Sequence, residues 1–596
     1  MLRASWAGIL AWLGAAMIVA GPGRAATVTI PVDEIRPGMR GVVMTVLRGT
    51  NAEPVETEIL GVLRNGIGPG KHMIIGRLVD EKTRVTGAVH GMSGSPLYID
   101  GRLAGALSRR VAIFEKDGHC GFTPIEDMLE TGAYLDGGAR RPARFSMRRL
   151  VREGLLGGGI TSDWLALPLE VSGATGRALR ALEKLWAGAG VILASGGGGR
   201  GDADAPGGEL TPGAAVSAAF LTGDITMGGT GTLTWRDGDR VLAFGHPMMG
   251  LGEVEMPMCE AEIITTVPSY QRPFKMANIR RVAGTVLEDR FSAIAGRVGP
   301  KPVLPAYRVR VDFEGRGPVE YRGNFLAQRE MAPSVVASLL IDSVLGSEHV
   351  GEEMTICVTG AMRLRNGQAL RLDGFSSGDA EVVVDAAMDM RGRLKRVFEQ
   401  PFEEIHPEGL DLDVRVAQRR EEARIESVTL WPRQARPGEV VRVEVRLERR
   451  WGGEEHREFE FTVPEEARAG EVLRVEANDE RTFLAKDSGT GGGGTGLLAL
   501  FGSRREEGPG PRSLGELIEG MNRLGRANVL MVRVSRQQDG VRDGWGRHED
   551  VPGSVAAVLR NGPSEVEAIS DSVVAEMRQA TEGAVEGSSV ARLTVR

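Results

Sequence analysis

Residues 87–107 read Gly87-Ala-Val-His-Gly-Met-Ser-Gly-Ser-Pro-Leu-Tyr-Ile-Asp-Gly-Arg-Leu-Ala-Gly-Ala-Leu107. The glycines around Ser93 predict a tight turn, and Asp100-Gly101 predicts a two-residue hairpin turn between apolar strands. A serine on such a turn exposes its hydroxyl, and the backbone N–H groups of Gly91 and Ser93 would point at one spot. Acyl transfer needs this arrangement of a nucleophile beside donors for the developing oxyanion.

A turn rich in glycine and serine, without chemistry, is the plainer explanation of the same motif. Pro96 and the apolar hairpin favour the catalytic one, because trypsin-like serine peptidases continue after their nucleophile in this way. Ser95 is an alternative nucleophile. His90 is a rival base, although it lies within the same turn as Ser93 and is too close in sequence to face that hydroxyl easily.

A second informative stretch is residues 228–247, in which strands at Thr230–Trp235 and Arg240–Phe244 flank an Arg236-Asp-Gly-Asp239 turn. His246 follows the second strand, held between a glycine and a proline. Side chains at strand ends project into clefts, and a general base needs rigid placement. A surface or core histidine is the alternative interpretation.

The composition favours a large exported protein with many short strands. The 596 residues include 83 glycines and 5% aromatic residues, which indicates turn-rich domains with aliphatic cores. The net charge of -7 without a basic block argues against a nucleic-acid partner. Residues 1–26 have the charged start, apolar stretch and small residues of a signal peptide, and an uncleaved anchor helix is the alternative. We therefore expect a periplasmic or secreted protein with no integral membrane span after cleavage.

Three cysteines are too few for a disulfide-built fold, although a Cys120–Cys259 bridge is conceivable. His119 beside Cys120 is too sparse for zinc, and we expect no metal or cofactor. The glycine-rich run at residues 195–208 is interpreted as a linker, since the Gly-Lys-Ser/Thr of a phosphate-binding loop does not follow it. The strand and helix patterns give these expected regions: serine half 27–140, insertion 141–225, histidine half with an extension 226–420, β-sandwich 421–487, linker 488–512 and an α+β tail 513–596.

Together the two motifs resemble the SpoIVB-type serine peptidases, the sporulation signalling peptidases. Thr86–Pro96 with its Asp-Gly hairpin is similar to the family's nucleophile motif, and Gly231–His246 is similar to its histidine motif. The resemblance implies a mainly β, trypsin-like double β-barrel with Ser93 as nucleophile and His246 as base. It implies Asp80 as the acid, at a slightly shorter spacing than in the family; Glu81 and Asp239 are fallback candidates.

One departure is the order of the segments, because the family places its histidine before the acid and the serine. Here the order is reversed, which indicates a circular permutation of the two half-barrels; geometry, and not chain order, defines a triad. Three functions stay open: an exported serine endopeptidase acting on a protein or peptide, an inactive peptidase fold that serves as an envelope scaffold or binding module, and another acyl hydrolase such as an esterase.

Overall fold

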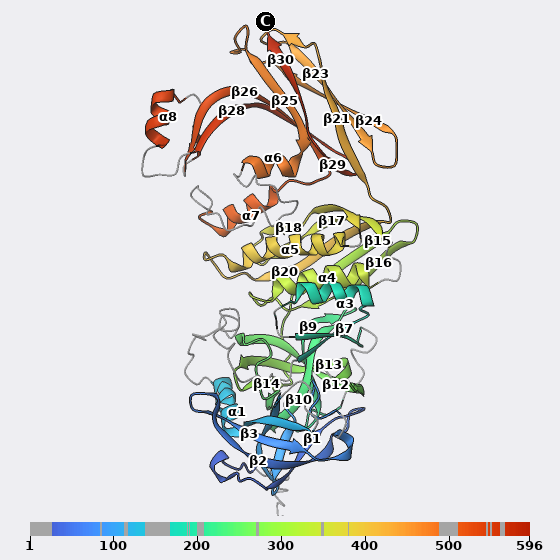
Figure 1. Ribbon diagram of the computed structural model, residues 1–596, viewed down its shortest axis with the longest axis vertical. Coiled ribbons are helices and arrows are strands. Elements are labelled where there is room, and N and C mark those ends of the chain that lie inside the picture. The colour runs from blue at the N-terminus through green and yellow to red at the C-terminus, as the bar shows by residue number, and fades with distance from the viewer. Residues whose placement is uncertain are drawn as a thin grey trace, which may run out of the picture.

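The computed structural model describes residues 27–83, 86–111, 117–136, 167–187, 189, 191–199, 208–269, 273–346, 351–379, 381–487, 511–543, 546–548, 551–560 and 567–596. The signal segment expected at residues 1–26 lies outside these residues, as do most of the 488–512 linker and residues 141–166 of the expected insertion. Figure 1 shows the described elements as successive layers along the long axis of the molecule.

The N-terminal region forms a closed six-stranded β-barrel. Its strands pair in the order β1 (Arg40–Thr45), β2 (Glu53–Gly68), β3 (Lys71–Leu78), β6 (His119–Pro124), β5 (Arg102–Arg110) and β4 (Pro96–Ile99), which returns to β1. Alternate residues of β1 and β2 point into an aliphatic core, as period-two patterns predict. Asp100 and Gly101 both have positive φ, which is the type I′ geometry that the Asp-Gly pair predicted.

A second ring of six strands follows in the chain. Its pairings run β9 (Ala215–Gly223), β12 (Gly252–Val267), β13 (Phe274–Arg290), β14 (Ala293–Val298), β11 (Arg240–Ala243) and β10 (Met227–Asp237), and β10 pairs back to β9. Six-stranded rings on both sides confirm the mainly β double-barrel fold, with the serine half first in the chain and the histidine half second. β7 (Leu167–Ser172) and β8 (Val191–Gly196) extend the second ring at β10.

The two barrels pack against each other through two small apolar clusters. One joins Leu103, Ala106 and Ile125 of the first barrel region to Leu242 and Ala295 of the second. The other joins Val46 to residues of β9, β12 and β13. Backbone bridges add direct links, at Gly49–Ile263 and at His90–Phe274. The serine turn, which lies between β3 and β4, is therefore at this interface.

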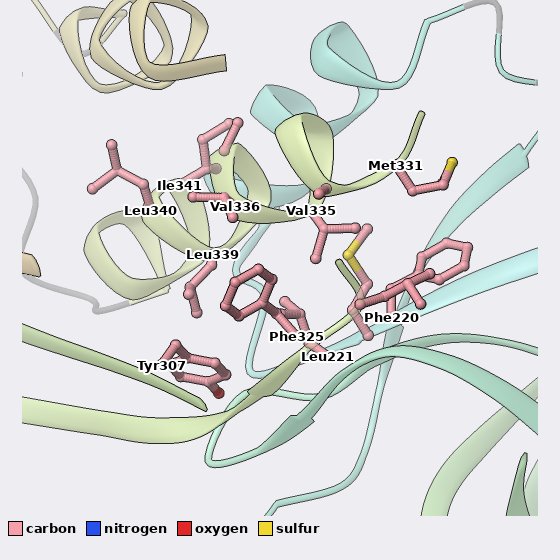
Figure 2. Close-up of a cluster of buried hydrophobic side chains, with 14 of the residues drawn as sticks. Phe220, Leu221, Tyr307, Phe325, Met331, Val335, Val336, Leu339, Leu340 and Ile341 are labelled. Carbon is pink, nitrogen blue, oxygen red and sulfur yellow. The ribbon is translucent and has the colours of Figure 1, made fainter. Parts of the chain in front are cut away.

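A third layer covers the second barrel with helices and further strands. α4 (Ala332–Leu345) is buried along its whole length, because the sheet packs on one side and α3 (Gly176–Leu185) and α5 (Val382–Glu399) pack on the other. Figure 2 shows its Val335 and Leu339 above Tyr307 and Phe325 of the sheet. The strands of this layer are β15 (Ala306–Phe313), β16 (Gly317–Phe325), β17 (Glu353–Leu364), β18 (Ala369–Arg371), β19 (Gly374–Asp379) and β20 (Pro407–Ala417).

The C-terminal lobe contains two sheets around one core. The first holds β21 (Glu422–Trp431), β23 (Val440–Arg449), β24 (Glu454–Thr462) and β29 (Ala584–Glu586). The second holds β22 (Gln434–Ala435), β25 (Val472–Asp479), β26 (Val529–Asp543), β27 (Gly546–His548), β28 (Glu567–Ala580) and β30 (Ser589–Val595). The helices α6 (Glu480–Asp487) and α8 (Gly553–Arg560) pack on the lobe, whereas α7 (Leu514–Asn522) packs on α5 and β18 of the third layer.

The region boundaries in the structure differ from those expected from the sequence. β9, at Ala215–Gly223, is a strand of the second barrel and not part of an insertion. Residues 195–198 are also ordered on the sheet, where Gly197 pairs with Asn278. The expected sandwich at 421–487 and the tail at 513–596 share one core. Alternating patterns identify strands, but they do not show which strands, distant in sequence, will share a core.

The cysteines can also be compared with their prediction. Cys120, Cys259 and Cys357 are free thiols, so the conceivable Cys120–Cys259 bridge is not formed. The Ser513 hydroxyl caps α7 by accepting from the Glu516 amide at 3.2 Å, and the Glu516 carboxylate accepts from the Arg512 amide at 2.8 Å. Within the described ranges, no helix is long and apolar enough to cross a membrane.

Candidate active site

The turn that carries Ser93 is bent by two glycines with positive φ. Gly91 has φ +93° and Gly94 has φ +91°, values that residues with a Cβ rarely adopt. Space is short as well, since a Cβ on Gly94 would lie 1.9 Å from the carbonyl oxygen of Thr232 and 2.4 Å from the amide nitrogen of Phe244. The glycines predicted as turn residues therefore also let the serine turn touch the backbone of the histidine hairpin.

Hydrogen bonds hold the carbonyl groups of this turn on one side. Thr232 donates its hydroxyl to Gly91 O at 3.1 Å and its amide to Ser93 O at 2.7 Å. Thr234 donates its hydroxyl to Gly94 O at 2.7 Å. Both threonines come from β10, the strand before the histidine. The second barrel thus fixes the conformation of the nucleophile turn of the first.

Two amide groups of the turn are left for another acceptor. The amide of Gly94 donates to Leu107 O, and that of Ser95 donates to Met92 O. The amides of Gly91 and Ser93 have no acceptor within the part of the chain that the structure describes. Buried amides are nearly always paired, so two unpaired amides in one fixed turn suit an oxyanion hole. The sequence singled out these same two groups.

The Ser93 hydroxyl is buried and makes no hydrogen bond to the described residues. Leaving a hydroxyl buried without a partner costs about 1–3 kcal/mol. Nothing in the described part of the fold compensates for this cost. A hydroxyl that becomes hydrogen-bonded only when its base and substrate are in place would explain why the cost is tolerated.

His246 reaches the interface on a sharply turned segment after β11. Phe244 and Gly245 have φ values of +72° and +69°. The carbonyl of Gly245 accepts from the Thr123 hydroxyl of β6 at 2.6 Å, which ties this segment to the first barrel. Gly94 packs against Phe244, so the serine and histidine segments meet two residues before His246.

The His246 ring has the tautomer that a general base requires. Nδ1 lies 2.7 Å from the carbonyl oxygen of Pro247. Because a carbonyl can only accept, Nδ1 carries the proton of the neutral ring, and the lone pair is on Nε2. The ring is 2% exposed. This backbone contact fixes the orientation of the ring; in serine peptidase triads a carboxylate makes the corresponding contact.

Asp289 organises the loop that follows the histidine. Its buried carboxylate accepts from the amides of Met248 at 2.7 Å, Met249 at 2.8 Å and Leu251 at 3.2 Å. Burial raises the pKa of this carboxyl, and the backbone hydrogen bonds partly oppose that rise. Asp289 thereby fixes the exit of the chain from His246.

The three predicted acid candidates all lie on or beside turns. The Asp80 carboxylate accepts from the amide of Lys82 at 3.0 Å and from that of Glu56 at 3.5 Å, and Glu81 lies in the same turn, η2 (Glu81–Thr83). Asp239 is exposed and binds Arg297 at 2.8 Å, which lowers the pKa of its carboxyl. The contacts of Asp80 are those of an ordinary turn aspartate. Its role as the acid stays a prediction.

The rival serine and histidine have structural contacts of their own. Ser95 is buried, and its hydroxyl lies 2.6 Å from Met92 O and 2.9 Å from the Thr45 hydroxyl. The backbone of His90 pairs with β13, through His90 N to Pro273 O and Lys275 N to His90 O, each at 2.9 Å. These contacts favour Ser93 over Ser95 as the nucleophile.

No group of three or more metal-ligating side chains occurs in the described ranges. A cavity of about 550 Å³ lies elsewhere, between the third layer and the C-terminal lobe. Arginines and acidic residues line it, and they pair with one another, as Arg526 and Arg371 do with Asp373 and Arg578 does with Glu480. The Arg526–Asp373 pair joins the two layers, and the three pairs together account for the polar lining.

Comparison with known proteins gives one match. The family described as SpoIVB peptidase S55 matches residues 18–129, which include the first barrel, Asp80 and the serine turn. The match ends before the second barrel and His246. No curated protein and no solved structure matches the chain. Over residues 18–129, then, the chain is similar to a peptidase family, as its nucleophile motif indicated.

Several residues of the site were not found from the sequence. The threonines of β10 had a visible signal, since Thr230, Thr232 and Thr234 alternate and share one face of a strand. Asp289 and Lys275 had none, because each lies in a long strand, and only the pairing of distant strands brings it to the site.

Proposed function

We propose that this chain is a serine endopeptidase of the SpoIVB type, with Ser93 as nucleophile and His246 as general base. The observation that carries the proposal is the serine turn itself. Its hydroxyl is buried without a partner among the described residues, and the only turn amides without an acceptor there are those of Gly91 and Ser93. The likeness of residues 18–129 to a peptidase family supports it.

The reaction follows the double-displacement course of serine peptidases. Ser93 Oγ attacks the scissile carbonyl carbon while its proton passes to His246 Nε2. The amides of Gly91 and Ser93 donate to the oxyanion, and the Pro247 carbonyl accepts from Nδ1–H of the imidazolium. The C–N bond then breaks as Nε2–H protonates the leaving amine. Water, deprotonated by the same nitrogen, then attacks the acyl carbon, and the bond from that carbon to Ser93 Oγ breaks as Nε2–H returns the proton to Oγ.

On this proposal, the buried site corresponds to a closed resting form. Ser93 is 0% exposed and His246 is 2% exposed, and Oγ is not hydrogen-bonded to the ring. A peptide bond can therefore reach Ser93 only after the surrounding segments separate. Catalytic hydrogen bonds of about 3 Å commonly tighten only once substrate is bound. We accordingly expect slow turnover of small substrates, set by opening.

A serine-directed fluorophosphonate tests the nucleophile. The full chain is incubated with the probe for hours, and the modified peptide is sequenced by tandem mass spectrometry. Wild type should acquire the label on Ser93, Ser93→Ala should acquire none, and Ser95→Ala should keep the label at position 93. Labelling that persists in Ser93→Ala and is lost in Ser95→Ala would overturn the assignment.

The two alternative functions, a binding module and another acyl hydrolase, predict different results in the same labelling experiment. If the chain is an inactive peptidase fold, wild type should stay unlabelled at every serine. Equal circular dichroism and unfolding midpoints of wild type and Ser93→Ala would then show that the unlabelled wild type is folded. An esterase or other acyl hydrolase would take the label at Ser93 but cleave only an activated ester. A mixture of unstructured peptides, analysed for new termini, separates it from a peptidase.

A further inference from the structure

Lys275, on β13 of the second barrel, is buried against the serine turn. Its side chain has no exposed surface, and no ion pair to it occurs in the described part of the chain. Burying a lysine without a paired carboxylate is costly, so such residues usually serve more than packing. Its aliphatic stem lies against Gly91, where a Cβ would come within 3.1 Å of the lysine Cβ.

The Lys275 amine begins a chain of hydrogen bonds that ends on the turn. Nζ donates to the Thr45 hydroxyl at 2.8 Å, and that hydroxyl lies 2.9 Å from the Ser95 hydroxyl. Ser95 Oγ lies 2.6 Å from the carbonyl oxygen of Met92. A carbonyl only accepts and a hydroxyl has one proton, so Ser95 donates to Met92 and Thr45 donates to Ser95. All three bonds therefore run in one direction and strengthen one another.

The end of this chain is the peptide unit next to the nucleophile. Met92 contributes the C=O of that unit, and Ser93 contributes the N–H. A peptide unit is planar and trans, so fixing its carbonyl on one side fixes its N–H on the other. That N–H is one of the two donors assigned to the oxyanion hole. The chain consequently acts on an amide that faces the substrate without touching the substrate itself.

We propose that Lys275 is a positioning residue for the oxyanion hole, acting through Thr45 and Ser95 on the Met92–Ser93 peptide. The inference rests on the proposed function, because it assigns Lys275 a part in the reaction at Ser93. A donor held in place before reaction costs no reorganisation when the oxyanion forms, and losing one such donor lowers rates by about 10²–10³. Losing only its support lowers the rate by roughly 10–100-fold.

A pair of substitutions at Thr45 separates hydrogen bonding from packing. Thr45→Val keeps the shape and removes the hydroxyl, whereas Thr45→Ser keeps the hydroxyl and removes the methyl group. The second-order rate constant for fluorophosphonate labelling of Ser93 should fall roughly 10–100-fold in Thr45→Val and stay within about threefold of wild type in Thr45→Ser. A packing role alone would give the opposite order.

Lys275→Met extends the test to the start of the chain. It should lower the labelling rate as Thr45→Val does, and the double variant should be no slower than the slower single variant, because both break one chain. Thr57→Val is the matched control, since it removes another buried hydroxyl of the same barrel, which among the described residues donates to the nearby Val55 O. It should label at the wild-type rate.

The outcomes distinguish this inference from the proposed function. If wild type labels at Ser93 while Thr45→Val and Lys275→Met label at its rate, the positioning role is overturned and the peptidase assignment stands. Multiplying effects in the double variant, or equal losses in Thr57→Val, would also overturn it. If wild type does not label Ser93 at all, both proposals fall together.

Discussion

The amide of Thr232 donates to the carbonyl oxygen of Ser93 at 2.7 Å, and this bond joins the histidine barrel to the proposed nucleophile. Neither barrel holds the site alone. In the proposed site, the first barrel supplies the hydroxyl and the oxyanion donors, and the second supplies the base and the strand that fixes the turn. These contacts depend on the packing of the barrels and not on their order in the chain.

The close approach at Gly94 predicts a large loss of stability on adding a methyl group. In Gly94→Ala the new Cβ would lie 1.9 Å from Thr232 O, and φ would stay at +91°. Overlap with backbone and a positive φ together should cost about 3 kcal/mol or more of unfolding free energy. Denaturant unfolding measures it. Gly101→Ala is the control, since φ is +74° there with no atom within 4 Å, and should cost only about 1–2 kcal/mol.

The buried Lys275 predicts a stability change that depends on pH. Desolvation lowers the pKa of Lys275 to about 7, against the opposing field of Glu53, from a usual 10.5. Between these values the unfolded chain binds one more proton than the folded chain, so wild-type stability rises with pH from 7 to 10.5 and is flat below 7. The difference between the two pKa values corresponds to at most about 5 kcal/mol of unfolding free energy.

Lys275→Met removes this dependence. The unfolding free energy of the variant minus that of wild type should be several kcal/mol larger at pH 6 than at pH 10. The lost bond to Thr45 lowers this difference by about 1 kcal/mol at both pH values. Denaturant melts at both pH values give the difference. A constant difference between the two proteins across this range would show that the lysine titrates normally.

Asp289 predicts a defect limited to the histidine loop. Asp289→Ala leaves the amides of Met248, Met249 and Leu251 without their buried acceptor, which should cost about 2–4 kcal/mol of stability. The labelling rate at Ser93 should fall with it. Amide hydrogen exchange should quicken at residues 248–251 and stay unchanged in the C-terminal lobe. Uniform quickening would mean that Asp289 supports the whole fold instead.

The contacts of Asp80 predict a small effect on the reaction. Asp80→Asn keeps one oxygen for the turn amides, and the Pro247 carbonyl still orients His246, so the labelling rate should fall less than about tenfold. A fall approaching the ~10⁴ typical of losing a triad aspartate would instead establish the acid predicted from the sequence. Asp239→Asn, measured beside it, should leave the rate unchanged because that carboxylate pairs with Arg297.

The sequence was most informative where short-range rules apply. Asp100-Gly101 selects its turn, Gly91 and Gly94 select positive φ, and the alternation at Ala306–Phe313 matches β15 residue for residue. These features depend on neighbours in the chain. Both motif hairpins could therefore be predicted, as could the serine turn with its two amides directed at one spot.

Long-range pairing was not accessible in the same way. Lys275 reaches Thr45 across 230 residues, and nothing in either local sequence indicates the contact. The strand at Val440–Arg449 alternates clearly, yet the core it shares with strands of residues 529–595 appears only when the sheets are assembled. Lys275 and Thr232 support the serine turn from the other barrel, and Asp289 supports the His246 loop from a neighbouring strand, β13, of its own barrel.

The most direct measurement of the central claim is the rate of labelling at Ser93 with and without the base. The second-order rate constant for fluorophosphonate modification, located at Ser93 by tandem mass spectrometry, is compared between wild type and His246→Gln at pH 8. General-base catalysis contributes about 10²–10⁴-fold to reaction rates. The labelling rate constant of His246→Gln should therefore be lower than that of wild type by this factor, with an unchanged unfolding midpoint. Labelling of Ser93 at the wild-type rate in His246→Gln would contradict it.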